Sequence, residues 1–130
     1  MIYLDTSALV KLVLEEDESA ALAEWLSARV DVPKISSDLA KIELLRVCRR
    51  VDQGAVAAAT RLLDGVDLVP MDRTIVETAA VVTPVDLRSL GAIHLASALL
   101  LHADLTALVA YDERLCSAAR RAAIEVASPA

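Results

Sequence analysis

The chain has 130 residues, of which 13 are lysine or arginine and 19 are aspartate or glutamate, so its net charge is −6. This length suits one domain with a real core, and we expect a single domain over residues 1–130. The acidic balance argues against a protein that coats nucleic acid with its whole surface, because phosphates need basic contacts. An aromatic content of 2% excludes a platform on which bases stack. No apolar run is long enough to cross a bilayer, and no signal-peptide pattern precedes the first strand. The two cysteines lack the spacing of a metal site or a redox motif. We therefore expect a cytoplasmic protein without membrane contact.

Apolar segments typical of strands alternate with amphipathic segments typical of helices. In chain order we predict strand 2–5, helix 6–14, helix 19–29, strand 35–36, helix 38–51, a helix ending at 63, strand 66–69, a helix after Asp72, helix 90–102, strand 106–111, helix 113–123 and strand 124–127. Pro33, Gly54 and Pro84 are predicted to separate neighbouring elements. The alternation implies parallel strand pairing, so the predicted fold class is α/β, a three-layer domain with a short parallel sheet flanked by helices.

Two aspartates follow predicted strands. Asp5 ends the first strand, and Asp112 comes directly after residues 106–111. The carboxyl ends of parallel strands meet at one edge of a sheet, which is where open α/β folds bind ligands, so we expect these carboxylates to lie together. Aspartate between a strand and a helix is also a favoured N-cap, and capping alone would explain either residue.

Glu43 interrupts the apolar side of its predicted helix. A carboxylate in such a place is costly unless it is paired or bound to a metal. The alternatives are an ion pair with Arg46 three residues on, worth about 0.2–0.5 kcal/mol, or simple exposure to solvent. We interpret His94, which stands among apolar residues, as a packing histidine rather than a ligand, whereas Lys11 could face the acids or extend to water.

Several short sequence motifs, taken together and in order, resemble those of the PIN-domain ribonucleases, and within them the VapC toxins of bacterial toxin–antitoxin pairs. The matching motifs are Tyr3-Leu4-Asp5-Thr6-Ser7-Ala8-Leu9-Val10-Lys11-Leu12, Ile42-Glu43-Leu44, Leu87-Arg88-Ser89-Leu90 with Ala92-Ile93-His94-Leu95-Ala96-Ser97-Ala98, Tyr111-Asp112-Glu113-Arg114-Leu115 and the terminal Val126-Ala127-Ser128-Pro129. They cover essentially the whole chain. No single motif is specific for this family, but the set of motifs is.

The resemblance implies a PIN-like fold and a metal-dependent RNA endonuclease that leaves a 3′-hydroxyl and a 5′-phosphate. It implies Mg²⁺ or Mn²⁺ held by Asp5 and Asp112, with Glu43 orienting or deprotonating the attacking water. Thr6 and Ser7 stand at a helix N-terminus and can donate to a carboxylate or a phosphate oxygen. The candidates for contacts with the RNA backbone are Thr6, Ser7, Arg46, Arg88 and Arg114. The expected partners are a cognate antitoxin and a second copy of the chain in a homodimer.

The chain departs from the family pattern at Gly91, where the family carries an aspartate that is normally a principal metal ligand. Asp86, five residues upstream, is not expected to replace it. We therefore expect a weakened or inactive nuclease, and the alternative is a catalytically silent scaffold that binds antitoxin or RNA without cleaving. A phosphoacceptor receiver domain also gathers acids at strand ends, but Asp5 lacks an adjacent acid and the last strand lacks a lysine.

Overall fold

A five-stranded parallel sheet forms the centre of the computed structural model, which describes residues 1–130. In spatial order its strands are β3 (Asp67–Val69), β2 (Lys34–Ser37), β1 (Ile2–Leu4), β4 (Ala107–Val109) and β5 (Val126–Ala127). The first strand of the chain is therefore the central one, and Tyr3 lies opposite Ile35 on one side and Leu108 on the other. All three residues of β1 are buried, as expected for a parallel strand that is covered on both faces.

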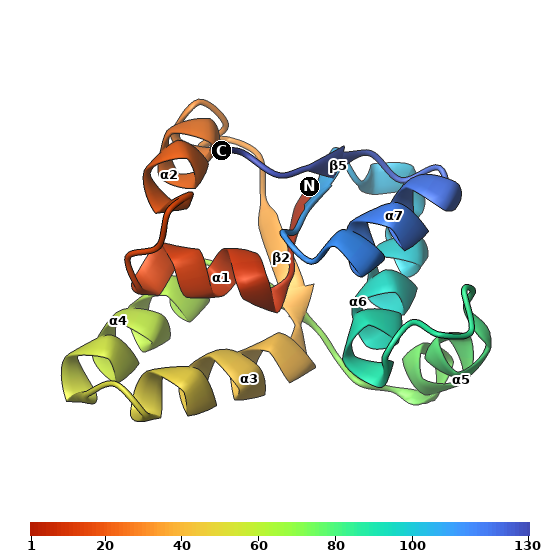
Figure 1. Ribbon diagram of the computed structural model, residues 1–130, viewed down its shortest axis with the longest axis horizontal. Helices are drawn as coiled ribbons and strands as arrows, with labels where there is room; N and C mark the ends of the chain where they lie inside the picture. Colours follow the sequence, from red (N-terminus) through yellow and green to blue (C-terminus); the bar gives the residue numbers. More distant parts are fainter.

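Helices cover both faces of the sheet (Figure 1). One face carries α1 (Thr6–Val13), α2 (Ser19–Ser27), α3 (Asp38–Arg49) and α4 (Gln53–Asp64), and the other carries α5 (Arg73–Val81), α6 (Ser89–Leu100) and α7 (Glu113–Arg121). A short 3₁₀ helix, His102–Asp104, follows α6. None of the helices combines the length and the apolar character needed to span a membrane. The predicted three-layer α/β architecture is confirmed.

The two faces of β1 belong to different apolar cores because successive side chains of a strand point to opposite sides. Ile2 and Leu4 join the core beneath α1 to α4, together with Leu9 and Leu44. Tyr3 joins the core beneath α6 and α7. The central strand is therefore held rigidly from both sides, and so is the residue that follows it.

Aspartate or serine N-caps begin most of the helices. The Oδ1 atoms of Asp5 and Asp112 accept the backbone N–H of Ala8 and Leu115, both at 2.9 Å. Asp52 and Asp72 cap α4 and α5 in the same way, so capping is a general device of this chain. The helix starts that sequence predicts from capping residues are confirmed.

Several predicted boundaries differ from the structure, and two of the differences have a clear local cause. Gly54 does not separate two helices but is the second residue of α4, because the Asp52 side chain accepts the Ala55 N–H and starts the helix before it. The strand predicted over residues 106–111 is confined to β4, because the neighbouring β1 offers only three residues to pair with. Residues 110–112 form the connection into α7, and the Ala110 N–H still donates to the Ala127 carbonyl of β5 at 3.2 Å.

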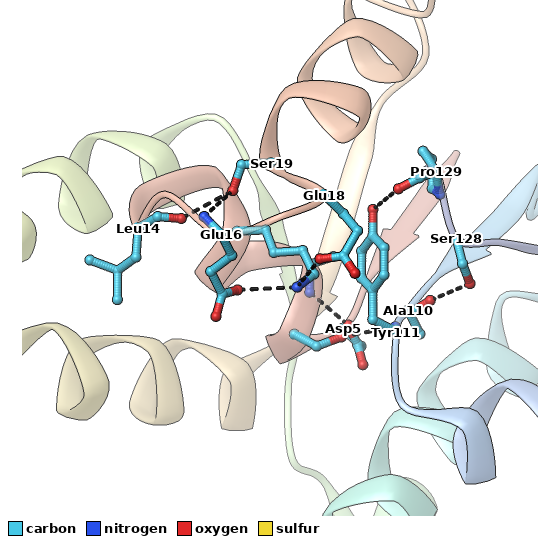
Figure 2. A network of polar contacts seen from close by, with 12 residues as sticks. Asp5, Leu14, Glu16, Glu18, Ser19, Ala110, Tyr111, Ser128 and Pro129 are labelled. Carbon is cyan, nitrogen blue, oxygen red and sulfur yellow. Dashed lines mark hydrogen bonds and ion pairs between the residues drawn. The ribbon is translucent and has the colours of Figure 1, made fainter.

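The C-terminal segment is fastened to the connection that leads from β4 to Asp112. The Tyr111 hydroxyl donates to the Pro129 carbonyl at 2.8 Å, and the Ser128 hydroxyl donates to the Ala110 carbonyl at 2.6 Å (Figure 2). Lys11 Nζ lies 4.6 Å from the centre of the Tyr111 ring and pairs with Glu16 and Glu18 at 3.2 and 2.9 Å. Lys11 thus holds α1, the start of α2 and Tyr111 together, and it does not pair with the acids at the sheet edge.

Candidate active site

A cavity of about 750 Å³ lies where the chain leaves β1 and β4 and where α1, α6 and α7 begin. The acids predicted from sequence, Asp5, Glu43 and Asp112, all line it. The rest of its wall is formed by Thr6, Ser7, Leu87, Arg88, Ser89, Leu90, Gly91, His94, Glu113, Arg114 and Leu115. Arg46 is exposed on α3 and does not line the cavity, so it is the one predicted site residue that the fold does not bring to the others.

Asp5 is the buried acid of the cavity, with 3% of its surface exposed. Its Oδ1 accepts from Ser7 Oγ at 2.6 Å as well as from the backbone of α1. Ser7 Oγ in turn accepts the Tyr111 N–H at 3.0 Å, which ties Asp5 to the segment just before Asp112. Burial raises the pKa of Asp5, the Ser7 hydrogen bond opposes that shift, and the negative charge of Asp112 adds to it.

Glu43 is half-buried across the cavity and is paired, but with partners that sequence did not indicate. Thr6 Oγ1 donates to Glu43 Oε1 at 2.6 Å, and His94 Nε2 lies 3.6 Å from the same oxygen. Burial alone would raise the pKa of Glu43, but the neighbouring His94 ring and the hydrogen bond from Thr6 outweigh it, and the pKa is lowered. Neither an ion pair with Arg46 nor simple exposure describes Glu43.

His94 is a satisfied buried histidine, as predicted, but it also stands in the cavity wall. It is 4% exposed, its Nδ1 lies 2.8 Å from the Tyr3 hydroxyl and its Nε2 lies 3.1 Å from Thr6 Oγ1. Sequence reasoning missed its place in the site. The available signal was its spacing, because residues 91 and 94 are three apart on α6 and therefore share one helix face.

Gly91 lies in the first turn of α6 beneath the side chain of Leu87. A Cβ atom added to Gly91 would stand 3.0 Å from Leu87 Cδ1 and 3.3 Å from its Cγ. Packing against Leu87 therefore bears on residue 91 as well as its chemistry. Asp86 is exposed and does not line the cavity.

The donor set of the cavity can be compared with the needs of a hard divalent cation. No three His, Cys, Asp or Glu side chains are grouped closely enough to share one metal ion. Asp5 and Asp112 each use Oδ1 to cap a helix, and no lysine or arginine pairs with either of them. Mg²⁺ commonly takes one or two protein carboxylates and completes its shell with water and substrate phosphate, so this pair of acids fits such an ion.

Comparisons with known proteins bear on the identity of this cavity. The model of the PIN domain family matches residues 2–121. Ribonuclease VapC47 of Mycobacterium tuberculosis is 43% identical over 132 residues, covering 99% of this chain and 97% of the relative. Ribonuclease VapC35 of the same species is 46% identical over 131 residues, again covering 99% and 97%.

Among solved structures, the chain resembles Mycobacterium tuberculosis VapC20, described as a Sarcin-Ricin loop cleaving toxin. The TM-score is 0.72 at 21% identity, and the match covers 91% of this chain and 95% of the other. That likeness concerns the fold, and the identity to the two curated relatives extends it to the sequence. This chain belongs to the PIN domain family and, within it, to the VapC ribonucleases.

Proposed function

We propose that this chain is the toxin of a toxin–antitoxin pair and that it is built as a metal-dependent endoribonuclease whose activity is weakened or lost because Gly91 replaces a ligand aspartate. The observation that carries the proposal is that Asp5, Glu43, Asp112 and position 91 line one cavity. Four elements far apart in sequence contribute these positions, which capping by itself would not require.

The proposed roles follow from the surroundings of each acid. Asp5 and Asp112 would hold Mg²⁺ or Mn²⁺, directly or through water, and the ion would polarise the scissile phosphate and lower the pKa of a bound water. Glu43 would orient or deprotonate the attacking water through Oε2, because both of its protein contacts go to Oε1. The lowered pKa keeps Glu43 ionised, so Oε2 can accept a hydrogen bond from the water and orient it.

RNA contact is assigned first to Arg88 and Arg114, whose exposed side chains flank the cavity. A local basic contact matters here because the chain as a whole is acidic and repels phosphate. The hydroxyl hydrogens of Thr6 and Ser7 go to Glu43 and Asp5, so these two residues support RNA binding by holding the acids in place.

Position 91 also favours a second candidate, a silent scaffold that binds antitoxin or RNA without cleaving. With two carboxylates and no third protein ligand, a bound cation would take most of the ligands in its coordination shell from substrate and water. Titration with Mn²⁺ separates the candidates, since a scaffold without a working site shows no saturable binding that depends on Asp5.

We propose that the chain forms one domain over residues 1–130. Its proposed partners are a small antitoxin protein and a second copy of the chain. Apolar side chains stand exposed on and after α5, among them Val81 at 77% and Val85 at 96%. Surface of this kind favours association. We propose the cytoplasm as the location, because RNA is there and both cysteines are free. Light scattering at micromolar concentration without antitoxin should give the mass of a dimer.

The experiment that tests the nuclease proposal is a digestion of total RNA by the chain and by Gly91→Asp, with Mg²⁺, with Mn²⁺ and with a chelator. We expect cleavage by Gly91→Asp that the chelator stops, and little or none by the glycine chain. The matched control is Gly91→Asn, which has the same shape without the charge. If Gly91→Asp and Gly91→Asn are equally inactive on RNA, the nuclease proposal is wrong.

A further inference from the structure

Four side chains in the wall of the cavity form one continuous line of contacts from the sheet to Glu43. The Tyr3 hydroxyl meets His94 Nδ1 at 2.8 Å, His94 Nε2 meets Thr6 Oγ1 at 3.1 Å, and Thr6 Oγ1 meets Glu43 Oε1 at 2.6 Å. The line joins β1, α6, α1 and α3. The line therefore connects helices from both faces of the sheet through the central strand.

The hydrogens of this line have one consistent arrangement. The 2.6 Å contact is that of a hydroxyl donating to a carboxylate, so the single hydrogen of Thr6 goes to Glu43. Thr6 Oγ1 must then be the acceptor in its contact with His94, and Nε2 carries a hydrogen.

The other ring nitrogen is fixed by Tyr3. Tyr3 is fully buried, and its hydroxyl makes its hydrogen bond with Nδ1. Burial raises the pKa of Tyr3 well above its usual value, against smaller lowering by the hydroxyls of Ser97 and Ser37, so the phenol keeps its hydrogen at neutral pH. The phenol makes its hydrogen bond of good geometry with Nδ1, at 2.8 Å, and a phenol that donates its hydrogen there leaves neither buried atom without a partner. Nδ1 is therefore bare.

The geometry points to His94 as a positioning residue: in its neutral Nε2–H form, selected by Tyr3, it orients Thr6 so that Thr6 holds Glu43 by Oε1 and leaves Oε2 without a protein contact. The role assigned to Oε2 rests on the proposed nuclease function. The state of the His94 ring does not, since it follows from contacts within the protein.

The ring state is tested directly by nitrogen NMR on the full chain labelled with ¹⁵N-histidine. The chain has two histidines, so His102→Gln assigns the spectrum. At pH 7.5 we expect His94 to show one protonated and one bare ring nitrogen, with the hydrogen on Nε2. Tyr3→Phe should shift the Nδ1 signal, because that nitrogen loses its donor. A doubly protonated ring, or a hydrogen on Nδ1, overturns the proposal whether or not the chain cleaves RNA.

The positioning role is tested by kinetics of His94→Leu and His94→Gln in the Gly91→Asp background. We expect His94→Leu to lower kcat roughly 10–100-fold, because displacements of about 1 Å at a reacting group cost rates of that order. KM should stay within about twofold, since the RNA contacts are elsewhere. His94→Gln retains an N–H donor for Thr6 and should recover most of kcat.

The control for a merely structural role is Ile75→Val, a buried substitution that packs against α6 away from the cavity. It should lower the melting temperature while leaving kcat unchanged. If kcat falls in proportion to the melting temperature across all three variants, or if Gln rescues no better than Leu, His94 does not position Thr6. Failure of every variant to cleave RNA, combined with the expected ring state, contradicts the nuclease proposal and leaves the assigned hydrogen arrangement standing.

Discussion

The side chain of Leu87 occupies the space that a Cβ atom on residue 91 would need, with its Cδ1 3.0 Å from that position. Leu87 is half-buried and belongs to the segment between α5 and α6, so it can turn away at modest cost. Any substitution at position 91 therefore has a packing effect and a chemical effect, and the two can be separated.

We predict that Gly91→Ala stabilises the protein by less than the approximately 1 kcal/mol that alanine gains over glycine inside a helix, because Leu87 must move. In a Leu87→Ala background the same substitution should give the larger gain. Urea denaturation of the four chains measures the difference. Equal gains in both backgrounds would show that Leu87 does not restrict this position.

Substitution of Asp112 should separate its capping role from its proposed metal role. Asp112→Asn keeps an oxygen for the Leu115 N–H, so the fold should keep its stability while Mn²⁺ binding, measured by calorimetry, is lost. Asp112→Ala should cost about 1 kcal/mol more in unfolding free energy. Asp72→Ala, which removes an equivalent cap outside the cavity, should cost the same and leave Mn²⁺ binding unchanged. Loss of Mn²⁺ binding in Asp72→Ala would mean that the effect comes from stability alone.

Burial of Asp5 gives a pH-dependent stability whose sign can be worked out. Its pKa in the folded protein is raised, so the contribution of Asp5 is fully present below its unfolded pKa and is lost as the pH rises through the folded value. The stabilisation that Asp5 contributes is therefore smaller at high pH than at low pH. Asp5→Asn, which keeps the cap, should raise the melting temperature by about 2–5 °C at pH 7.5 and have little effect near pH 4.

The matched control for Asp5 is Asp52→Asn, because Asp52 is an exposed N-cap of the same kind. It should shift the melting temperature little at either pH. A gain for Asp5→Asn that is the same at both pH values would contradict the burial argument.

The contact between Lys11 and Tyr111 should be measurable as a coupling energy. We expect a double-mutant cycle of Lys11→Met and Tyr111→Leu to give about 0.5–1 kcal/mol, the usual strength of a cation over an aromatic ring at a partly exposed site. Tyr111→Phe keeps the ring and removes only the hydrogen bond to Pro129, so it should preserve the coupling to Lys11. Additive unfolding free energies in the cycle would rule out the interaction.

Sequence predicted the parts of this protein that depend on local pattern. Asp5 and Asp112 were placed correctly because a strand, an acid and a helix follow one another within a few residues. The partners of Glu43 could not be predicted, because Thr6 is 37 residues away and meets it only through the packing of α1 on α3. The position of Leu87 over Gly91 could not be predicted either, because the segment between α5 and α6 has no hydrophobic periodicity from which its packing could be inferred.

The central place of β1 also affects when the site can exist during synthesis. Asp5 is synthesised before β4, the strand with which β1 pairs, and Asp112 lies beyond β4. A nascent chain that stops before residue 107 carries Asp5 and Glu43 without the strand that holds one side of β1 or the acid that shares its cavity. The cavity that contains both aspartates can therefore form only after most of the domain has been synthesised.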